Sequence, residues 1–116
     1  MTSTCLKLLA GASFPIWPWD GRPGCAVEAF PAAQLWQWQL PHEGYNGNDK
    51  EAMRSCIVDG LVDRIDLGEH RERMMTSADA LDAVLCVFAA IAVTEEQLAF
   101  PPESSAGTEG WIGVHE

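Results

Sequence analysis

The chain has 116 residues, of which 47% are hydrophobic, so its length suits one domain with a single modest core. Seventeen acidic residues against seven basic ones give a formal net charge of −10. This balance argues against binding nucleic acid through clustered Lys and Arg side chains. Any phosphate chemistry by this chain would therefore use metal ions to offset the charge.

The cysteines and the apolar segments indicate a cytoplasmic protein. The cysteines are scattered without a C-x-x-C pair, which predicts reduced, buried thiols. The N-terminal residues lack the charged leader of a signal peptide. The longest apolar run, residues 83–93, is well short of the roughly 20 residues that cross a bilayer, so we expect no membrane association. The four cysteines are Cys5, Cys25, Cys56 and Cys86.

Two strands and one helix are predicted in the first third of the chain. Residues 14–19 contain two prolines, which limit them to an edge or irregular strand. After a dense turn signal, residues 25–30 form an uninterrupted run that is typical of a buried strand. A helix is predicted over residues 31–39, because Pro31 suits the first helical turn. Residues 40–47 are expected to form a loop.

An amphipathic helix is predicted over residues 49–65, because apolar residues recur there every four positions. Asn48 or Asp49 is the expected N-cap, and Glu51 occupies the capping-box position if Asn48 is the cap. The charged segment 69–75 is expected to add one or two exposed helical turns.

The next helix is the most apolar element of the chain. Ser77 is its expected N-cap, and it is predicted to run to about residue 97. Because residues 83–93 are apolar on nearly all sides, the helix should lie inside a layered fold, covered by a sheet. A last short strand is predicted at residues 110–114. The pattern indicates an α/β fold with two or three short strands packed by three main helices.

Three carboxylates are the candidate site residues. Asp79 and Asp82 lie three residues apart at the start of the apolar helix, so they share one helix face. Glu28 lies near the end of the predicted strand at 25–30. One strand acid with a helical Asp pair matches the ligand set of a divalent-metal nuclease. The alternative is that the aspartates serve the helix dipole and cap, each contributing some 0.3 to 1 kcal/mol, and that Glu28 lies at an exposed sheet edge.

Other conspicuous side chains fit packing or surface roles better. Trp36 and Trp38 point to different sides of their predicted helix, so core and rim packing explains them better than a base-stacking platform. His42 lies in a Gly-containing loop, where it is either solvated or contacts a substrate. No Ser, Cys or Thr lies beside a His and an acid in a convincing arrangement, so nucleophilic catalysis is rejected.

Five short segments, in this order, resemble the C-terminal half of domain-of-unknown-function family 429. That family looks like a predicted nuclease of the ribonuclease H-like fold. The similarity extends over most of the chain. The segments are Ile16-Trp17-Pro18-Trp19-Asp20-Gly21, Val27-Glu28-Ala29-Phe30-Pro31-Ala32-Ala33, Leu40-Pro41-His42-Glu43-Gly44-Tyr45, Asp79-Ala80-Leu81-Asp82-Ala83 and Glu109-Gly110-Trp111-Ile112.

The resemblance implies that Glu28, Asp79 and Asp82 converge on one side of the sheet and hold Mg²⁺ or Mn²⁺ ions that activate water. The first strands of a ribonuclease H-like fold carry further acids, and residues 1–13 do not resemble them. The chain is therefore expected to be a single domain over residues 1–116 that forms the C-terminal part of a longer domain. By itself it should form a partial ribonuclease H-like layer that binds metal weakly and is inactive.

Three functions remain open at this point. The first is a metal-dependent phosphodiesterase that acts on nucleic acid only through its metal ions. The second is a noncatalytic interaction module that completes its sheet with another chain. The third is a small-molecule binder that uses a cleft around Glu28 and the Trp-rich turn. Because few strands are available to cover the apolar helix, the chain is expected to form a homodimer or to pair with a missing N-terminal half.

Overall fold

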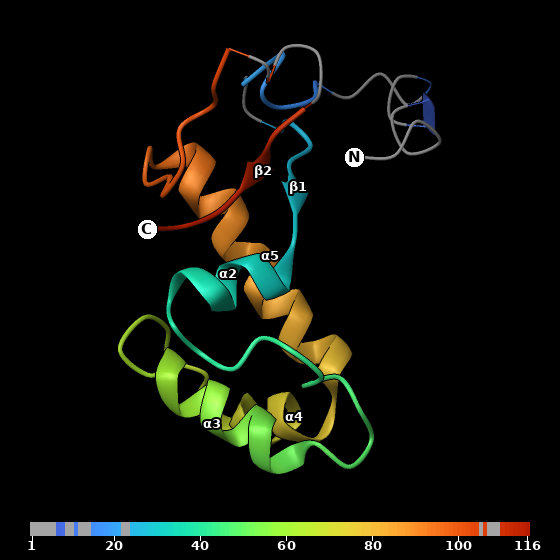
Figure 1. Ribbon diagram of the computed structural model, residues 1–116, viewed down its shortest axis with the longest axis vertical. Helices are drawn as coiled ribbons and strands as arrows, with labels where there is room; N and C mark the ends of the chain where they lie inside the picture. The colour runs from blue at the N-terminus through green and yellow to red at the C-terminus, as the bar shows by residue number, and fades with distance from the viewer. Residues whose placement is uncertain (1–6, 9–10, 12–14, 22–23, 105, 107–109) are drawn as a thin grey trace. The chain divides into compact units, whose positions relative to one another are not determined.

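The computed structural model describes residues 7–8, 11, 15–21, 24–104, 106 and 110–116. In these residues, four α-helices, one 3-10 helix and a two-stranded parallel sheet confirm the mixed α/β class (Figure 1). The chain divides into two compact units. Residues 1–30 and 88–116 form the first, here called the sheet unit, and residues 31–87 form the second, here called the helical unit. A ribonuclease H-like layering stays a prediction.

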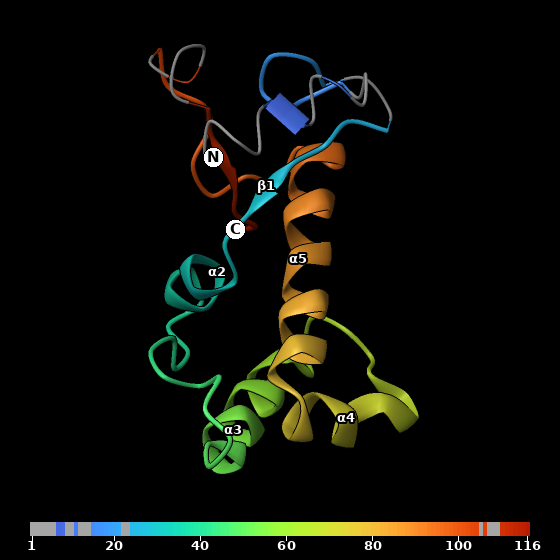
Figure 2. The same cartoon turned by 90° about the vertical axis from the view of Figure 1, so that its right-hand side faces the viewer.

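The strands of the sheet unit are short. β1 (Glu28–Ala29) runs parallel to β2 (Ile112–Gly113), and Glu28 lies opposite Ile112. The two strands lie side by side in Figures 1 and 2. The predicted strands at 25–30 and 110–114 therefore contain the observed ones, but only two residues of each join the ladder. In the part of the chain that the structure describes, no helix combines the length and the apolar character needed to cross a membrane.

A glycine allows the close packing beside this sheet. A Cβ added to Gly113 would lie 2.8 Å from Cγ1 of Val27 and 3.1 Å from the carbonyl oxygen of Ala89. Only glycine fits there without displacing its neighbours. The strand predicted at 14–19 is reduced to a single parallel bridge between Ile16 and Ala26, and a turn that contains a cis Trp17-Pro18 peptide follows it. Residue 14 lies outside the described residues.

The helical unit begins with α2 (Pro31–Gln37) and α3 (Glu51–Leu61). The 3-10 helix η1 (Gly68–His70) leads directly into α4 (Arg71–Thr76), which packs beside α3 in both views (Figures 1 and 2). The unit ends with the first part of α5 (Ala78–Thr94). Side chains from the helices and one loop form a contiguous apolar core. Its buried members are Leu35, Tyr45, Ile57, Val58, Leu61, Met74, Leu81 and Leu85.

The boundaries of α3 and α5 depart from the predictions for physical reasons. The N-cap of α3 is Lys50, without a side-chain cap, because a turn that joins the Lys50 N–H to the Gly47 carbonyl keeps residues 48 and 49 outside the helix. The expected caps Asn48 and Asp49 are therefore wrong. In α5 the helix ends before residue 97, because Glu96 adopts a φ of 55°.

The expectation that α5 is covered on nearly all sides is wrong. Leu81 and Leu85 are fully buried, but Ala83, Cys86 and Val87 are exposed in the same stretch, with 49% of Val87 accessible. A single buried stripe is enough to hold this part of the helix against the core. The expectation of buried cysteines is also wrong for Cys56 and Cys86, which are exposed free thiols, while Cys25 is a half-buried one. Cys5 lies outside the described residues.

Candidate functional site

The start of α5 positions the two candidate aspartates. Ser77 caps the helix as predicted: its Oγ accepts a hydrogen bond from the Ala80 N–H at 3.2 Å, and its carbonyl accepts one from the Leu81 N–H at 3.1 Å. Asp79 lies in the first turn and is exposed, and Asp82 lies one turn further and is half-buried. Their spacing of three residues places them on one helix face.

Asp82 has a specific partner. The hydroxyl of Tyr45 donates a hydrogen bond of 2.6 Å to Oδ1 of Asp82, across 37 residues of sequence. Burial of the phenol, the hydrogen bond to Asp82 and the charge of that carboxylate raise the pKa of Tyr45 well above its usual value. The tyrosine therefore stays a donor at neutral pH, and it fixes one carboxylate oxygen of Asp82.

The thiol of Cys86, one turn beyond Asp82, has a pKa that is raised by desolvation and by the nearby carboxylate. A raised pKa lowers the thiolate fraction, which makes a thiol less reactive. Cys86 is therefore not a candidate nucleophile, in agreement with the rejection of nucleophilic catalysis from the sequence.

A buried arginine lies beside this region. Arg54, in α3, is only 2% exposed, and its guanidinium donates to three backbone carbonyls. Nε donates to Met75 at 2.6 Å, and Nη1 donates to Tyr45 and to Gly47 at 2.7 Å each. The side chain thus ties the loop after residue 44 to the end of α4, and it fixes the backbone of the same tyrosine that holds Asp82.

A polar cleft of about 280 Å³ opens where these segments meet. Backbone and side chains of the loop, of α3 and of the start of α5 line it. Arg54 supplies a cation and Asp79 a carboxylate, and the remaining side chains are amides and hydroxyls or small. The lining residues are Asn46, Gly47, Asn48, Arg54, Thr76, Ser77, Ala78 and Asp79.

Glu28 lies in the other unit. It is half-buried in β1, whereas the sequence predicted a buried strand with this acid near its end. Its convergence with Asp79 and Asp82 stays a prediction, because the aspartates belong to the helical unit. Among the residues that the structure describes, no three His, Cys, Asp or Glu side chains are grouped as metal ligands.

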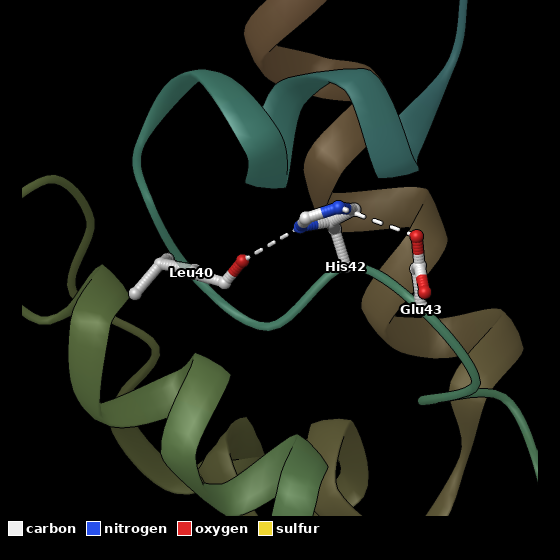
Figure 3. A network of polar contacts seen from close by, with 3 residues as sticks. All are labelled: Leu40, His42 and Glu43. Carbon is white, nitrogen blue, oxygen red and sulfur yellow. Dashed lines mark hydrogen bonds and ion pairs between the residues drawn. The ribbon is translucent and has the colours of Figure 1, made fainter.

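The polar contacts of His42 with described residues lie within its own loop. Nδ1 lies 3.3 Å from the Leu40 carbonyl oxygen, and Nε2 lies 3.8 Å from a carboxylate oxygen of Glu43 (Figure 3). His70 likewise lies 3.6 Å from its neighbour Glu69. These contacts agree with the expectation that His42 is a loop histidine, and the structure places His70 at the surface.

Tyr45 and Arg54 are the residues that sequence reasoning missed. Tyr45 ends the Leu40–Tyr45 segment, but nothing in the sequence paired it with Asp82. Arg54 had a stronger signal, because it precedes Ile57, Val58 and Leu61 by three, four and seven residues and so lies on the apolar stripe of α3. A cation on such a stripe indicates a buried charge.

These observations define a mixed α/β protein with a carboxylate-bearing polar cleft at the start of its longest described helix. The chain belongs to the family described as "Protein of unknown function (DUF429)", whose model matches residues 6–106. Comparison with curated proteins and with solved structures gave no match.

Proposed function

We propose that this chain is the metal-binding part of a metal-dependent phosphodiesterase of the ribonuclease H-like type. The observation that carries the proposal is the pair Asp79 and Asp82 on one face of α5, with Tyr45 fixing the second carboxylate. A catalytic carboxylate must be held in one orientation, and a hydrogen bond from a neighbouring side chain is a common means. Glu28 is proposed as the third acid.

The donor chemistry suits a hard divalent cation. Carboxylate oxygens are the ligands that Mg²⁺ and Mn²⁺ prefer. Asp79 is exposed at the cleft and so is accessible to a cation from solvent. An ion bound there would supply Lewis-acid activation of water and of a phosphoryl oxygen. The net charge of −10 makes the cation the means by which an anionic substrate approaches this chain.

The residues around the carboxylates have supporting roles. Tyr45 orients Asp82, Ser77 fixes the first turn that carries Asp79, and Arg54 holds the loop that carries Tyr45. The chain is proposed to act in the cytoplasm, where exposed thiols such as Cys86 stay reduced. Because no three His, Cys, Asp or Glu ligands are grouped among the described residues, the chain should bind metal weakly and hydrolyse nothing by itself.

A second candidate is a noncatalytic interaction module. Two-residue strands give a marginal sheet, and the side chain of Val87 is half exposed on α5. Both features favour a homodimer, or pairing with another chain that adds a strand next to the sheet. Light scattering tests this candidate. A monomer at the protein concentrations used for metal titration would count against the interaction module and favour the metal-dependent phosphodiesterase.

Isothermal titration with Mn²⁺ tests the first proposal. The wild-type chain should bind with a dissociation constant in the millimolar range, and Asp79→Asn and Asp82→Asn should each weaken binding beyond detection. Asp63→Asn removes the same charge from an exposed position outside the cleft and should leave binding unchanged. Equal binding by all four proteins would contradict the proposal. Cleavage of DNA or RNA by the chain alone, lost in Asp79→Asn, would support the site and overturn the expected inactivity.

A further inference from the structure

We infer that the cleft at the start of α5 is a phosphate pocket and that Arg54 is the cation that binds the phosphate group. The inference deepens the proposed function and rests on it only for the choice of phosphate among anions. The cleft itself, its lining and the state of Arg54 are features of the helical unit alone.

Arg54 carries a charge that no described carboxylate compensates. Its side chain is 98% buried, but its hydrogen-bond partners are neutral backbone carbonyls, and it forms no ion pair with a described carboxylate. Buried cations are usually paired, because desolvation of an unpaired charge is costly. The exposed Arg71, in contrast, is paired with Asp59. A bound anion would supply the counter-charge that Arg54 lacks.

Arg54 also has more N–H donors than its carbonyl partners use. A guanidinium has five N–H groups. The carbonyls of Met75, Tyr45 and Gly47 use the one on Nε and the two on Nη1, which leaves the two on Nη2. Among described residues no fully buried side-chain nitrogen lacks a partner, so Nη2 retains contact with solvent. Because Arg54 lines the cleft, this pair of donors is available to an oxyanion that enters it.

The other residues that line the cleft also suit an oxyanion. The side-chain amides of Asn46 and Asn48 and the hydroxyl of Thr76 add donors. The first turn of α5, a 17-residue helix, presents N–H groups and the positive end of its dipole. Asp79 is the one carboxylate of the lining. In metal-free protein its negative charge repels a phosphate, so removing this charge should strengthen phosphate binding.

A purely structural arginine is the alternative. In that case Arg54 would serve only to bind the three carbonyls, and the cleft would bind no anion. Replacing Arg54 cannot separate the two roles by itself, because the loop that it holds would also loosen. Asn48 and Asp79 are better targets, since both side chains are exposed and neither takes part in the three hydrogen bonds of Arg54.

The experiment is phosphate binding followed by phosphorus NMR in the presence of a chelator, with inorganic phosphate and dimethyl phosphate as probes. The wild-type chain should bind inorganic phosphate saturably. Asp79→Asn, which removes one negative charge close to the anion, should bind it roughly five-fold more tightly. Asn48→Asp, which adds one, should bind it roughly five-fold more weakly. Gln37→Glu, which adds a negative charge outside the cleft, should bind like the wild type. Binding of dimethyl phosphate as well would identify a diester site, and binding of inorganic phosphate alone a site for a terminal phosphate.

Absence of saturable binding, or equal binding by wild type, Asp79→Asn and Asn48→Asp, would overturn the inference. Mn²⁺ titration of the same variants in the absence of chelator distinguishes the failure of this inference from the failure of the proposed function. Metal binding without phosphate binding would support the carboxylate metal site and contradict the phosphate pocket. Phosphate binding without metal binding would support the phosphate pocket and contradict the proposed metal-dependent phosphodiesterase.

Discussion

The helical unit and the sheet unit are built in different ways, and the candidate chemistry follows the difference. In the helical unit, neighbouring helices and one loop form a contiguous core. Four of the candidate residues belong to this unit: Tyr45, Arg54, Asp79 and Asp82. In the sheet unit, two strands of two residues and isolated bridges join distant segments, and Glu28 is the one candidate there. Polar side chains are thus positioned where the surrounding core is continuous.

The difference between the units also concerns the range of their contacts. The helical unit is one continuous segment, so its contacts need little loop closure, whereas β1 pairs with a strand more than eighty residues away. Long-range pairing costs more chain entropy before it contributes stability. We therefore expect substitutions in the helical core to have the largest effects, and the following predictions test that ranking.

The largest effect is expected from Leu81→Ala. Leu81 is fully buried in the helical core, so its loss should lower the free energy of unfolding by about 3 kcal/mol. Val87→Ala is the matched control in the same helix, and since its side chain is half exposed it should cost less than about 1 kcal/mol. Urea denaturation measures both. Similar losses would mean that α5 is buried all round after all.

Arg54→Met should be nearly as destabilising. It leaves three carbonyl groups without their donor, and about 2 kcal/mol is expected to be lost in urea denaturation. Arg71→Met breaks an exposed ion pair with Asp59 and should cost no more than about 1 kcal/mol. If Arg54→Met proves as mild as its control, the loop at residues 45–47 is held by other contacts.

Two glycines qualify this ranking, because an added Cβ meets rigid backbone in the sheet unit and a flexible side chain in the helical unit. Gly113→Ala in β2 would press a Cβ against the carbonyl oxygen of Ala89 as well as Val27, and should cost about 2 kcal/mol. Gly60→Ala in α3 would meet the flexible side chain of Leu40, while gaining about 1 kcal/mol of helix propensity. Its net effect should be smaller. Thermal unfolding followed by circular dichroism gives the shift in melting temperature for both variants. A larger loss for Gly60→Ala would show that the packing around Gly113 adapts to a Cβ more easily than the packing around Gly60.

Apart from the controls and Gly60→Ala, Tyr45→Phe should show the smallest stability change at neutral pH, about 1.5 kcal/mol for one hydrogen bond to a carboxylate. The raised pKa of Tyr45 adds a pH dependence. Above pH 10 the unfolded chain loses the phenol proton while the folded chain keeps it, so the stability of the wild type falls as the pH rises. The variant should lack this part of the decline. Since Tyr45 is the single tyrosine, alkaline absorbance also follows its ionisation alone. A midpoint near 10 would contradict a buried, hydrogen-bonded phenol.

Local elements were predictable from the sequence, and long-range contacts were not. The Ser77 cap, the stripe of α3 and the turn at 69–75 follow from neighbouring residues, and the structure confirms them. The pairing of Tyr45 with Asp82, 37 residues apart, and the partners of β1 depend on how segments meet, which no periodicity encodes. The burial of Arg54 lies between these cases, because its place on an apolar stripe was visible, whereas its carbonyl partners were not.

Paramagnetic broadening of amide signals by Mn²⁺ in isotope-labelled protein would locate the bound ion residue by residue. If Asp79 and Asp82 hold the ion with Glu28 as the third ligand, the signals of the first turn of α5 should broaden first, together with that of Glu28. Asp79→Asn should abolish both effects. Broadening centred on another acidic segment, such as residues 63–66, or broadening that Asp79→Asn leaves unchanged, would contradict the account.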